Sequence, residues 1–389
     1  MRTAVVVGAG LAGLTTAGAL ARSGWHVVLL ESAERVAAPP TALVLWPNGR
    51  RALESLDPDG GWSMIASPLA DGGVRRPDGQ WLVAPRAAGA GSAVHLEDLY
   101  DALVAGLGDR VEVRTGFRVT TILTGPGLRP VVGDGRTEIE ADLVVAADGI
   151  DSTIRRILAP GSVAVGSGFA AWQAVVPGYR LPSRSGGPAA GGETLGVGYR
   201  FVSVPLGDRA AGHGGVYWIA TAAGAPRPES PATQLELLRR WFAGWHPPVG
   251  ELLAATHAGD LVPREVRELR PLPRAYAFPS GPGGVVLLGD AAHAMPHHLG
   301  QGACLAFEDA ATLRSLAGEA TPGAGLTAAL EAYSRVRQPR AATVVRQTQR
   351  MSAVVRARGR LALRARDAAL GHLRPRLLSG PFAEWSPPA

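Results

Sequence analysis

A glycine-rich turn near the N-terminus constrains the fold more than any other feature of the chain. Residues 3–7 form a short apolar run rich in valine, which predicts a buried strand. The sequence GAGLAG follows, with Gly8, Gly10 and Gly13 in the GxGxxG pattern, ahead of a helix predicted over residues 11–22. Gly8 allows a tight turn, Gly10 lets a pyrophosphate approach the backbone, and Gly13 lets the helix pack closely on the strand. The chain therefore begins with a predicted dinucleotide-binding βαβ unit.

The strand after this helix ends in an acidic residue. Residues 27–30 form a second apolar run, and Glu31 closes it. An acid at this point is placed to accept hydrogen bonds from the ribose hydroxyls of an adenosine. The acid disfavours the 2′-phosphate of NADP, so the turn suits either FAD or NAD. Ala12, among the first helical residues, belongs to the same turn. The free N–H groups and the dipole of the helix favour the negative charge of the phosphates.

Two later motifs repeat the arrangement of a buried strand followed by a polar turn. The first strand spans residues 142–147 and the second spans residues 285–288. The residues that follow them are Asp148, Gly149 and Arg155 in the first motif, and Gly289, Asp290, Gly300, Gln301 and Gly302 in the second. A second GxGxxG with a following acid does not occur in the sequence. A reductase with two dinucleotide domains would need one, so the pattern favours an enzyme that NAD(P)H visits only transiently.

These three motifs, in this order, resemble the fingerprints of the group A FAD-dependent monooxygenases, the para-hydroxybenzoate and salicylate hydroxylase-like flavoproteins. Weaker similarity lies between them in LWPNGRRALESL, in AAWQAVVP at residues 170–177 and in WFAGWHPPVGELL at residues 241–253. The resemblance extends to about Arg340. It implies a single-component monooxygenase that uses NADPH or NADH and O2 to hydroxylate or epoxidise an aromatic or unsaturated small molecule through a C4a-hydroperoxyflavin.

The resemblance also assigns residues to the cofactor. It implies that Asp290 bonds the ribityl and pyrophosphate part of FAD, and that Asp148 and Arg155 support the cofactor from the second motif. The turn at Gly300 would lie beside the pyrimidine edge of the isoalloxazine, where a helix N-terminus favours the negative charge of a reduced flavin. The expected cofactor-binding residues are Gly8, Gly10, Ala12, Gly13, Glu31, Asp148, Gly149, Arg155, Asp290, Gly300, Gln301, Gly302 and Ala303.

The expected fold class is α/β, with a Rossmann-like FAD-binding domain, an interleaved antiparallel-sheet substrate domain and C-terminal helices. The stretches GFAAWQAVV, LGVGYRFVSVPL and GGVYWIATAA are short, alternating and bounded by Gly and Pro, which favours an antiparallel sheet. The expected FAD-binding domain comprises residues 1–70, 96–165 and 270–335. The expected substrate domain comprises residues 71–95 and 166–269, and the C-terminal helical region residues 336–389.

The substrate pocket is expected under the antiparallel sheet, which would roof the flavin. The candidate pocket residues are Trp172, Tyr199, Tyr217, Trp218 and Trp46, although each aromatic side chain also suits plain core packing. The candidate catalytic residues are His297, His298 and Gln173. His297 precedes the flavin-facing turn, and an imidazole can act as an acid or base near neutral pH. The cluster of His293, His297 and His298 lacks further ligands at a suitable spacing, so no metal site is expected.

Three stretches depart from the family pattern, and in one of them PTALVL stands where the family commonly has GAGI before WPN. Leu96, in the sequence HLEDL, stands where the family often has an arginine that contacts FAD, and Arg155 or Arg35 could compensate. His297 stands where the family usually has proline. Two other functions therefore stay open: an FAD-bound non-redox cyclase or isomerase on the same fold, and a flavin-binding protein that is not an enzyme. Oxygen uptake that depends on NAD(P)H separates them from a monooxygenase.

The composition excludes several other chemistries. All 39 residues counted as Lys+Arg are arginine, so the chain has no lysine for a Schiff base, a P-loop or a flavin-dependent halogenase. The single cysteine, Cys304, cannot form an intrachain disulfide, which fits a reducing cytoplasm. The net charge of +6 comes mostly from scattered arginines, so neither a nucleic-acid partner nor an integral membrane location is expected. The expected partners are O2 and a small-molecule substrate, for a monomer or homodimer.

Overall fold

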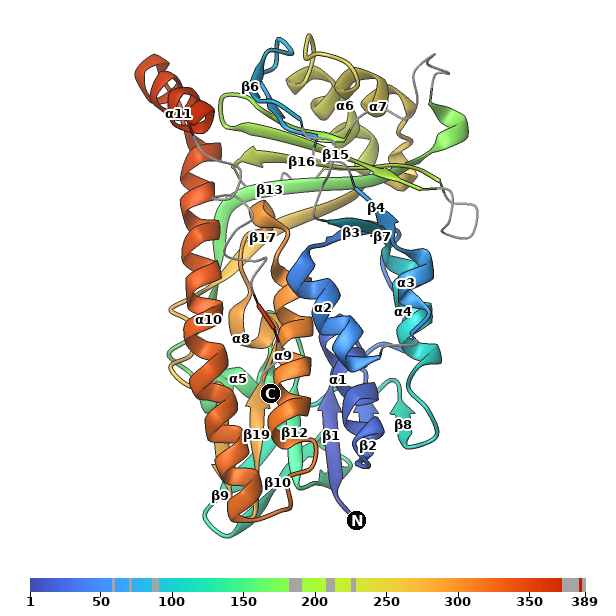
Figure 1. The fold of residues 1–389 in the computed structure, drawn as a ribbon, viewed down its shortest axis with the longest axis vertical. Helices are drawn as coiled ribbons and strands as arrows, with labels where there is room; N and C mark the ends of the chain where they lie inside the picture. The colour runs from blue at the N-terminus through green and yellow to red at the C-terminus, as the bar shows by residue number, and fades with distance from the viewer. Residues whose placement is uncertain are drawn as a thin grey trace.

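The computed structural model describes residues 1–57, 60–69, 72–85, 91–181, 191–207, 214–224, 229–372 and 385–386. Its lower half in Figure 1 is built on a six-stranded sheet. In spatial order the strands are β18 (Ala277–Ser280), β19 (Gly283–Leu287), β12 (Leu143–Ala146), β1 (Thr3–Val7), β2 (His26–Leu30) and β8 (Val111–Arg114). All neighbours pair in parallel except β18, which pairs antiparallel with β19. This confirms the expected Rossmann-like domain and the α/β class.

Burial on both faces explains why the central strands are continuous apolar runs. Val5 of β1 lies between Val28 of β2 and Val144 of β12, and all three side chains are buried. Helices α1 (Leu11–Arg22), α9 (Gly302–Ala317) and α10 (Ala324–Arg356) belong to the same packed body. The carboxyl ends of β1, β12 and β19 carry the three sequence motifs, so the parallel sheet brings all three to one edge.

The second large sheet has seven strands and forms the upper part of Figure 1. Its order is β17 (Val262–Arg270), β13 (Val163–Pro177), β16 (Gly215–Ala223), β15 (Tyr199–Leu206), β14 (Gly192–Leu195), β5 (Val74–Arg75) and β6 (Trp81–Val83). Its pairs are antiparallel except β14 with β5. We call this seven-stranded sheet the substrate sheet.

The two faces of the substrate sheet contact different partners, because alternate side chains of a strand point to opposite faces. On the outer face Trp172 and Trp218 belong to one apolar cluster with residues of α6 (Pro231–Trp241) and α7 (Val249–Ala255). On the inner face Phe169 and Tyr217 belong to another, which includes Val355 of α10. The inner face is therefore the one turned toward the long helix and the parallel sheet.

The remaining elements complete two small sheets and several short helices. One sheet consists of β11 (Glu138–Glu140), β10 (Leu128–Gly133) and β9 (Thr121–Gly125), and the other of β3 (Ala42–Leu45), β7 (Ser92–His95) and β4 (Ser67–Pro68). The other helices are α2 (Pro47–Leu56), α3 (Trp62–Ile65), α4 (Leu96–Ala105), α5 (Thr153–Leu158), α8 (Asp290–His293), α11 (Arg360–His372) and the 3₁₀ turns η1 (Gly178–Arg180), η2 (Ala258–Asp260) and η3 (His297–Leu299).

Helix α10 does not respect the expected boundary at residue 336. It runs without interruption from Ala324 to Arg356, from the edge of the parallel sheet to the substrate sheet (Figure 1). The expected segment 71–95 is also shared, because β5 and β6 join the substrate sheet while β7 pairs with β3. Within the described ranges, no helix combines the length and apolar character needed to cross a membrane.

Candidate flavin site

The glycine-rich turn has the geometry that the three glycines predict. Gly8 adopts a φ of +101°, in the left-handed region that favours glycine. A Cβ atom at Gly13 would collide with the carbonyl oxygen of Gly8, so helix and turn are in direct contact. A Cβ at Gly10 would meet nothing nearer than the Tyr100 hydroxyl, at 3.9 Å. The protein itself therefore has room for a larger residue at position 10. Glycine is needed there only if a ligand approaches the backbone closely.

The start of α1 is lined by two side chains that accept backbone N–H bonds. Glu31, after β2, accepts hydrogen bonds from the N–H of Ala9 at 2.8 Å and from the N–H of Ala33 at 2.9 Å. The hydroxyl of Tyr100, on α4, accepts the N–H of Leu11. Burial, and then the charge of Glu31, raise the pKa of Tyr100. The phenol is therefore neutral at the helix N-terminus, where the dipole would favour a phosphate.

The second motif folds back on itself. One oxygen of Asp148 accepts the N–H of Thr153 at 2.8 Å, while the other is buried without a partner in the described residues. Burial raises the pKa of this carboxyl. Arg155 is buried, and its guanidinium donates to the carbonyls of Ile150 at 2.6 Å and Ala291 at 3.4 Å. Arg155 thus ties the second motif to the third through its two terminal nitrogens, while its Nε is buried without a partner in the described residues.

The third motif presents Asp290 to solvent within a crowded surrounding. Its side chain is exposed, yet the surrounding protein raises its pKa, against the opposing charges of His293, Arg264 and Arg155. Gly289 before it adopts a φ of +59°, and its N–H donates to Asp309 at 2.9 Å.

The turn after α8 exposes backbone and leaves buried polar atoms without partners. Gly300 has a φ of +61°, and a Cβ at Gly302 would meet no atom within 4 Å. The amide nitrogen of Gln301 and the indole nitrogen of Trp46 are buried donors with no partner among the described residues. A Cβ at Gly300 would lie 3.1 Å from that indole nitrogen. Orphaned donors next to open glycines fit the carbonyl and ring-nitrogen acceptors of a flavin pyrimidine ring.

Asn48 connects this turn to a buried ionic network that the sequence did not reveal. Its amide nitrogen donates to Gln301 at 2.9 Å and to Glu308 at 2.7 Å. Arg337 of α10 contacts Glu308 and Asp309, each at 2.7 Å, and all three side chains are fully buried. Although burial alone would raise it, His293 and Arg337 hold the pKa of Asp309 below its usual range.

His297 and His298 follow α8 and have different surroundings. The Nε2 atom of His297 is hydrogen-bonded to the hydroxyl of Thr221, on the inner face of β16, at 2.8 Å. Burial and the charge of Arg200 lower the pKa of His297 to about 3. His298 is buried against the ring of Phe169, with centroids 4.7 Å apart, and burial lowers its pKa to about 2. Both imidazoles are therefore neutral near pH 7.

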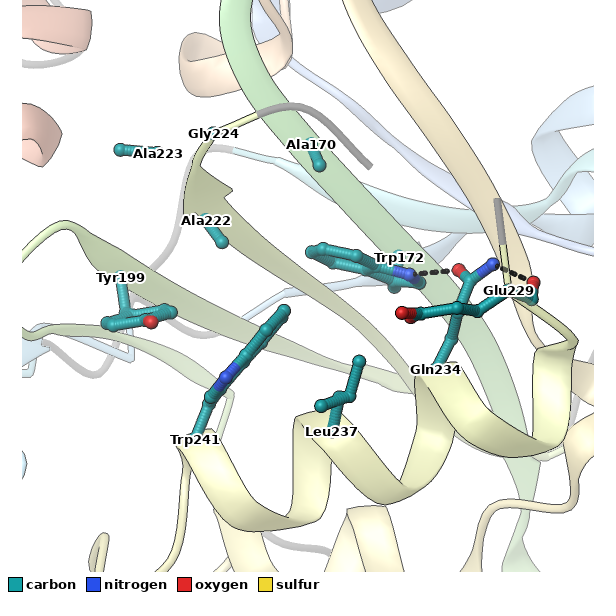
Figure 2. Close-up of a pocket in the computed structure, with 10 residues that line it drawn as sticks. All are labelled: Ala170, Trp172, Tyr199, Ala222, Ala223, Gly224, Glu229, Gln234, Leu237 and Trp241. Carbon is teal, nitrogen blue, oxygen red and sulfur yellow. Dashed lines mark hydrogen bonds between the residues drawn. The ribbon is translucent and has the colours of Figure 1, made fainter. Parts of the chain in front are cut away.

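The other expected pocket residues lie on two faces of the substrate sheet. Gln173 and Tyr217 are on the inner face, with Gln173 paired to Ile219 and Tyr217 to Val175. Trp172, Tyr199 and Trp218 are on the outer face, and the structure does not bring them to the flavin side. Figure 2 shows Trp172 and Tyr199 with Trp241 of α6 around a cavity. The volume of this cavity is about 180 Å³. The Trp172 indole donates to Gln234 there, at 2.6 Å.

Known proteins match the chain over these same regions. An NAD(P)-binding Rossmann-like domain matches residues 6–38, and an FAD binding domain matches residues 249–348. The aurachin C monooxygenase/isomerase of Stigmatella aurantiaca is 32% identical over 366 residues, which cover 90% of this chain and 89% of the relative. The salicylate hydroxylase of Pseudomonas putida is 32% identical over 371 residues, which cover 87% and 82%.

A solved structure matches the whole architecture. A variant of Klebsiella pneumoniae HpxO in complex with FAD superposes with a TM-score of 0.81 at 25% identity, covering 98% of this chain and 97% of that chain. The expected cofactor and the expected enzyme class are thereby confirmed. The chain belongs to the family of FAD-dependent monooxygenases that includes salicylate hydroxylase.

Proposed function

We propose that this enzyme uses NAD(P)H and O2 to hydroxylate or epoxidise an aromatic or otherwise unsaturated small molecule. The observation that supports this most is the junction at His297. The residues that fit a flavin pyrimidine ring, at Gly300 and Gly302, follow directly after an imidazole that is bonded to the inner face of the substrate sheet. Flavin and substrate would therefore meet between this turn and that face.

Bound FAD would accept electrons from NAD(P)H and activate O2. The residues of the chain would bind the flavin and orient the substrate. The donors of Gln301 and Trp46 and the N-terminus of α9 would stabilise negative charge on the pyrimidine edge. The sheet above would exclude water from the reacting groups. His297 would hold a substrate oxygen or nitrogen by a hydrogen bond without changing its own charge, because its pKa is lowered to about 3.

The inner face also suggests a substrate class. Gln173 and Tyr217 stand on it as neutral polar groups among apolar neighbours such as Ile219. Such a surface suits a flat ring that carries a few hydrogen-bonding substituents. The related enzymes act on substrates of this kind, salicylate and 3-amino-4-hydroxybenzoate among them. We infer an aromatic or heteroaromatic substrate whose polar substituent faces His297.

A second candidate activity is isomerisation, because one relative is named as a monooxygenase/isomerase. A rearrangement of the product after oxygen transfer would use the same inner face as a template. A reaction that runs without any oxygen transfer would instead need neither NAD(P)H nor O2.

The reduction step tests the proposal. We expect rapid-mixing spectroscopy to show slow bleaching of the flavin absorbance by NADH or NADPH alone, and faster bleaching when an aromatic substrate is present. A panel of hydroxybenzoates and 4-quinolones provides candidate substrates. If neither nucleotide reduces the flavin with any compound of the panel, while a compound is still converted, the isomerase candidate replaces the proposal.

A further inference from the structure

Phosphate recognition in this chain lacks the cation that the family pattern places at residue 96. Leu96, at the start of α4, has no charge, although the family often has an arginine at that position. The two terminal nitrogens of Arg155 donate to backbone carbonyls, which leaves only its buried Nε without a partner among the described residues. The dipole of α1 favours the pyrophosphate, but a helix terminus contributes less than a full charge.

Arg264 is a cation that neither the motifs nor the family pattern indicated. It lies on β17, where alternation places it on the same face as Val266, and Val266 belongs to the inner apolar cluster. It pairs with Ala171 of β13, and Ala171 pairs in turn with Thr221 of β16. Arg264 therefore stands on the inner face, in the same row across the sheet as the hydroxyl that binds His297.

The side chain of Arg264 is exposed and has no hydrogen bond or ion pair to another described residue. The next arginine along the same strand contrasts with it, because Arg267 forms a double hydrogen bond with Asp151, at 2.8 and 2.9 Å. An unpaired guanidinium on a face turned toward the flavin site is free to take a ligand anion, and guanidinium groups bind phosphate oxygens in a bidentate manner.

The charge of Arg264 also influences groups on other elements that line this face. The positive charge of Arg264 opposes the raised pKa of Asp290 in the third motif, of Tyr100 on α4 and of Tyr217 on β16, each of which is raised mainly by burial. Tyr100 in turn accepts the N–H of Leu11, next to Gly10. This influence on Tyr100 and Asp290 agrees with the strand pairing, which places the exposed Arg264 on the inner face turned toward the cofactor motifs.

We propose that Arg264, which extends from the substrate sheet, supplies the cation for the pyrophosphate of FAD and so replaces the arginine that the family carries at the position of Leu96. The proposal rests on the flavin site of the proposed monooxygenase but not on its turnover. FAD would then contact both large sheets, because α1 follows β1 of the parallel sheet and Arg264 lies on β17 of the substrate sheet.

The test is the affinity of the apoprotein for FAD, measured by the quenching of flavin fluorescence without NAD(P)H or substrate. Arg264→Gln is expected to raise the Kd for FAD about tenfold to a hundredfold, as for the loss of a hydrogen bond to a charged group. Arg264→Lys is expected to retain part of the affinity. Arg136→Gln, which removes an exposed arginine from the turn between β10 and β11, is the control with the same charge change and is expected to leave the Kd unchanged.

A second variant makes the role specific. Leu96→Arg in the Arg264→Gln background is expected to recover most of the lost affinity, whereas Leu96→Arg alone is expected to gain less, because one cation is already present. The melting temperature of each apoprotein shows whether it is folded, and Arg264→Gln should not change it. An unchanged Kd for FAD in Arg264→Gln would overturn the proposal, as would a change only in the KM for NAD(P)H or substrate. Neither result would bear on whether the enzyme transfers oxygen.

Discussion

The Nε2 atom of His297 lies 2.8 Å from the hydroxyl of Thr221, and this hydrogen bond joins the third cofactor motif to a central strand of the substrate sheet. The imidazole stays neutral near pH 7, because burial and Arg200 lower its pKa to about 3. A neutral ring in this position fixes the distance between the flavin-binding turn and the inner face of the sheet without adding a charge between them.

His297→Ala is expected to retain FAD but to form less product for each NAD(P)H consumed. The residues that fit the cofactor do not include this imidazole, whereas substrate positioning depends on it. Thr221→Val should lower the same ratio by a smaller factor, since it frees the imidazole without removing it. The ratio of product to NAD(P)H oxidised measures this, and equal ratios in wild type and both variants would return His297 to a purely packing role.

Gly10→Ala and Gly13→Ala should fail in different ways. Because a Cβ at residue 10 meets no protein atom nearer than 3.9 Å, Gly10→Ala is expected to fold and melt like the wild-type apoprotein but to purify without FAD. Gly13→Ala places its Cβ against the carbonyl oxygen of Gly8 and is expected to lower the melting temperature of the apoprotein itself. Visible absorbance and thermal melts measure both effects. Full FAD content in Gly10→Ala would contradict the account of the turn.

The buried imidazole of His298 predicts a specific loss of stability in acid. Its pKa is lowered to about 2 in the folded protein, so below about pH 6.5 the unfolded chain binds a proton that the folded protein does not. The stability that the neutral His298 provides is therefore complete above about pH 6.5. As the pH drops from there toward 2, the free energy of unfolding falls by about 1.4 kcal/mol per pH unit. His298→Leu should flatten this part of the curve of unfolding free energy against pH, and His26→Gln should not. Parallel curves for wild type and His298→Leu would rule the explanation out.

Arg337→Met is expected to destabilise the protein strongly. The variant leaves Glu308 and Asp309 buried without the guanidinium that contacts both at 2.7 Å. Breaking a buried ion pair in this way typically costs about 3–5 kcal/mol of unfolding free energy. Arg346→Met, on the exposed side of the same helix, should change it by no more than about 0.5 kcal/mol. Urea denaturation compares the two, and similar midpoints would show that the network does not support the third motif.

The three cofactor motifs could be predicted because each is a continuous stretch in which strand, turn and helix are local properties of the sequence. The parallel order of β1, β12 and β19 then brings them together. The pocket was harder to predict. Alternation shows that Trp172 and Gln173 face opposite sides of β13, but it does not show which side faces the flavin.

The contacts that the sequence did not reveal join residues far apart in the chain. Asn48 meets Glu308, and Arg337 meets Asp309, only after the long helix α10 packs on α9. Arg264 carries no local pattern at all, since its position depends on the pairing of β17 with β13. Arg155 was expected to support the cofactor, and its part in the second motif could not be anticipated because its partners are backbone carbonyls.

The central claim is that the enzyme transfers one oxygen atom from O2 to its substrate at the expense of NAD(P)H. Mass spectrometry of the product formed under ¹⁸O2 tests it most directly. The account predicts that the product gains one labelled oxygen atom, and that both its formation and the consumption of O2 stop when NAD(P)H is withheld. A product that forms at the same rate without NAD(P)H or O2, and that carries no label, would contradict it.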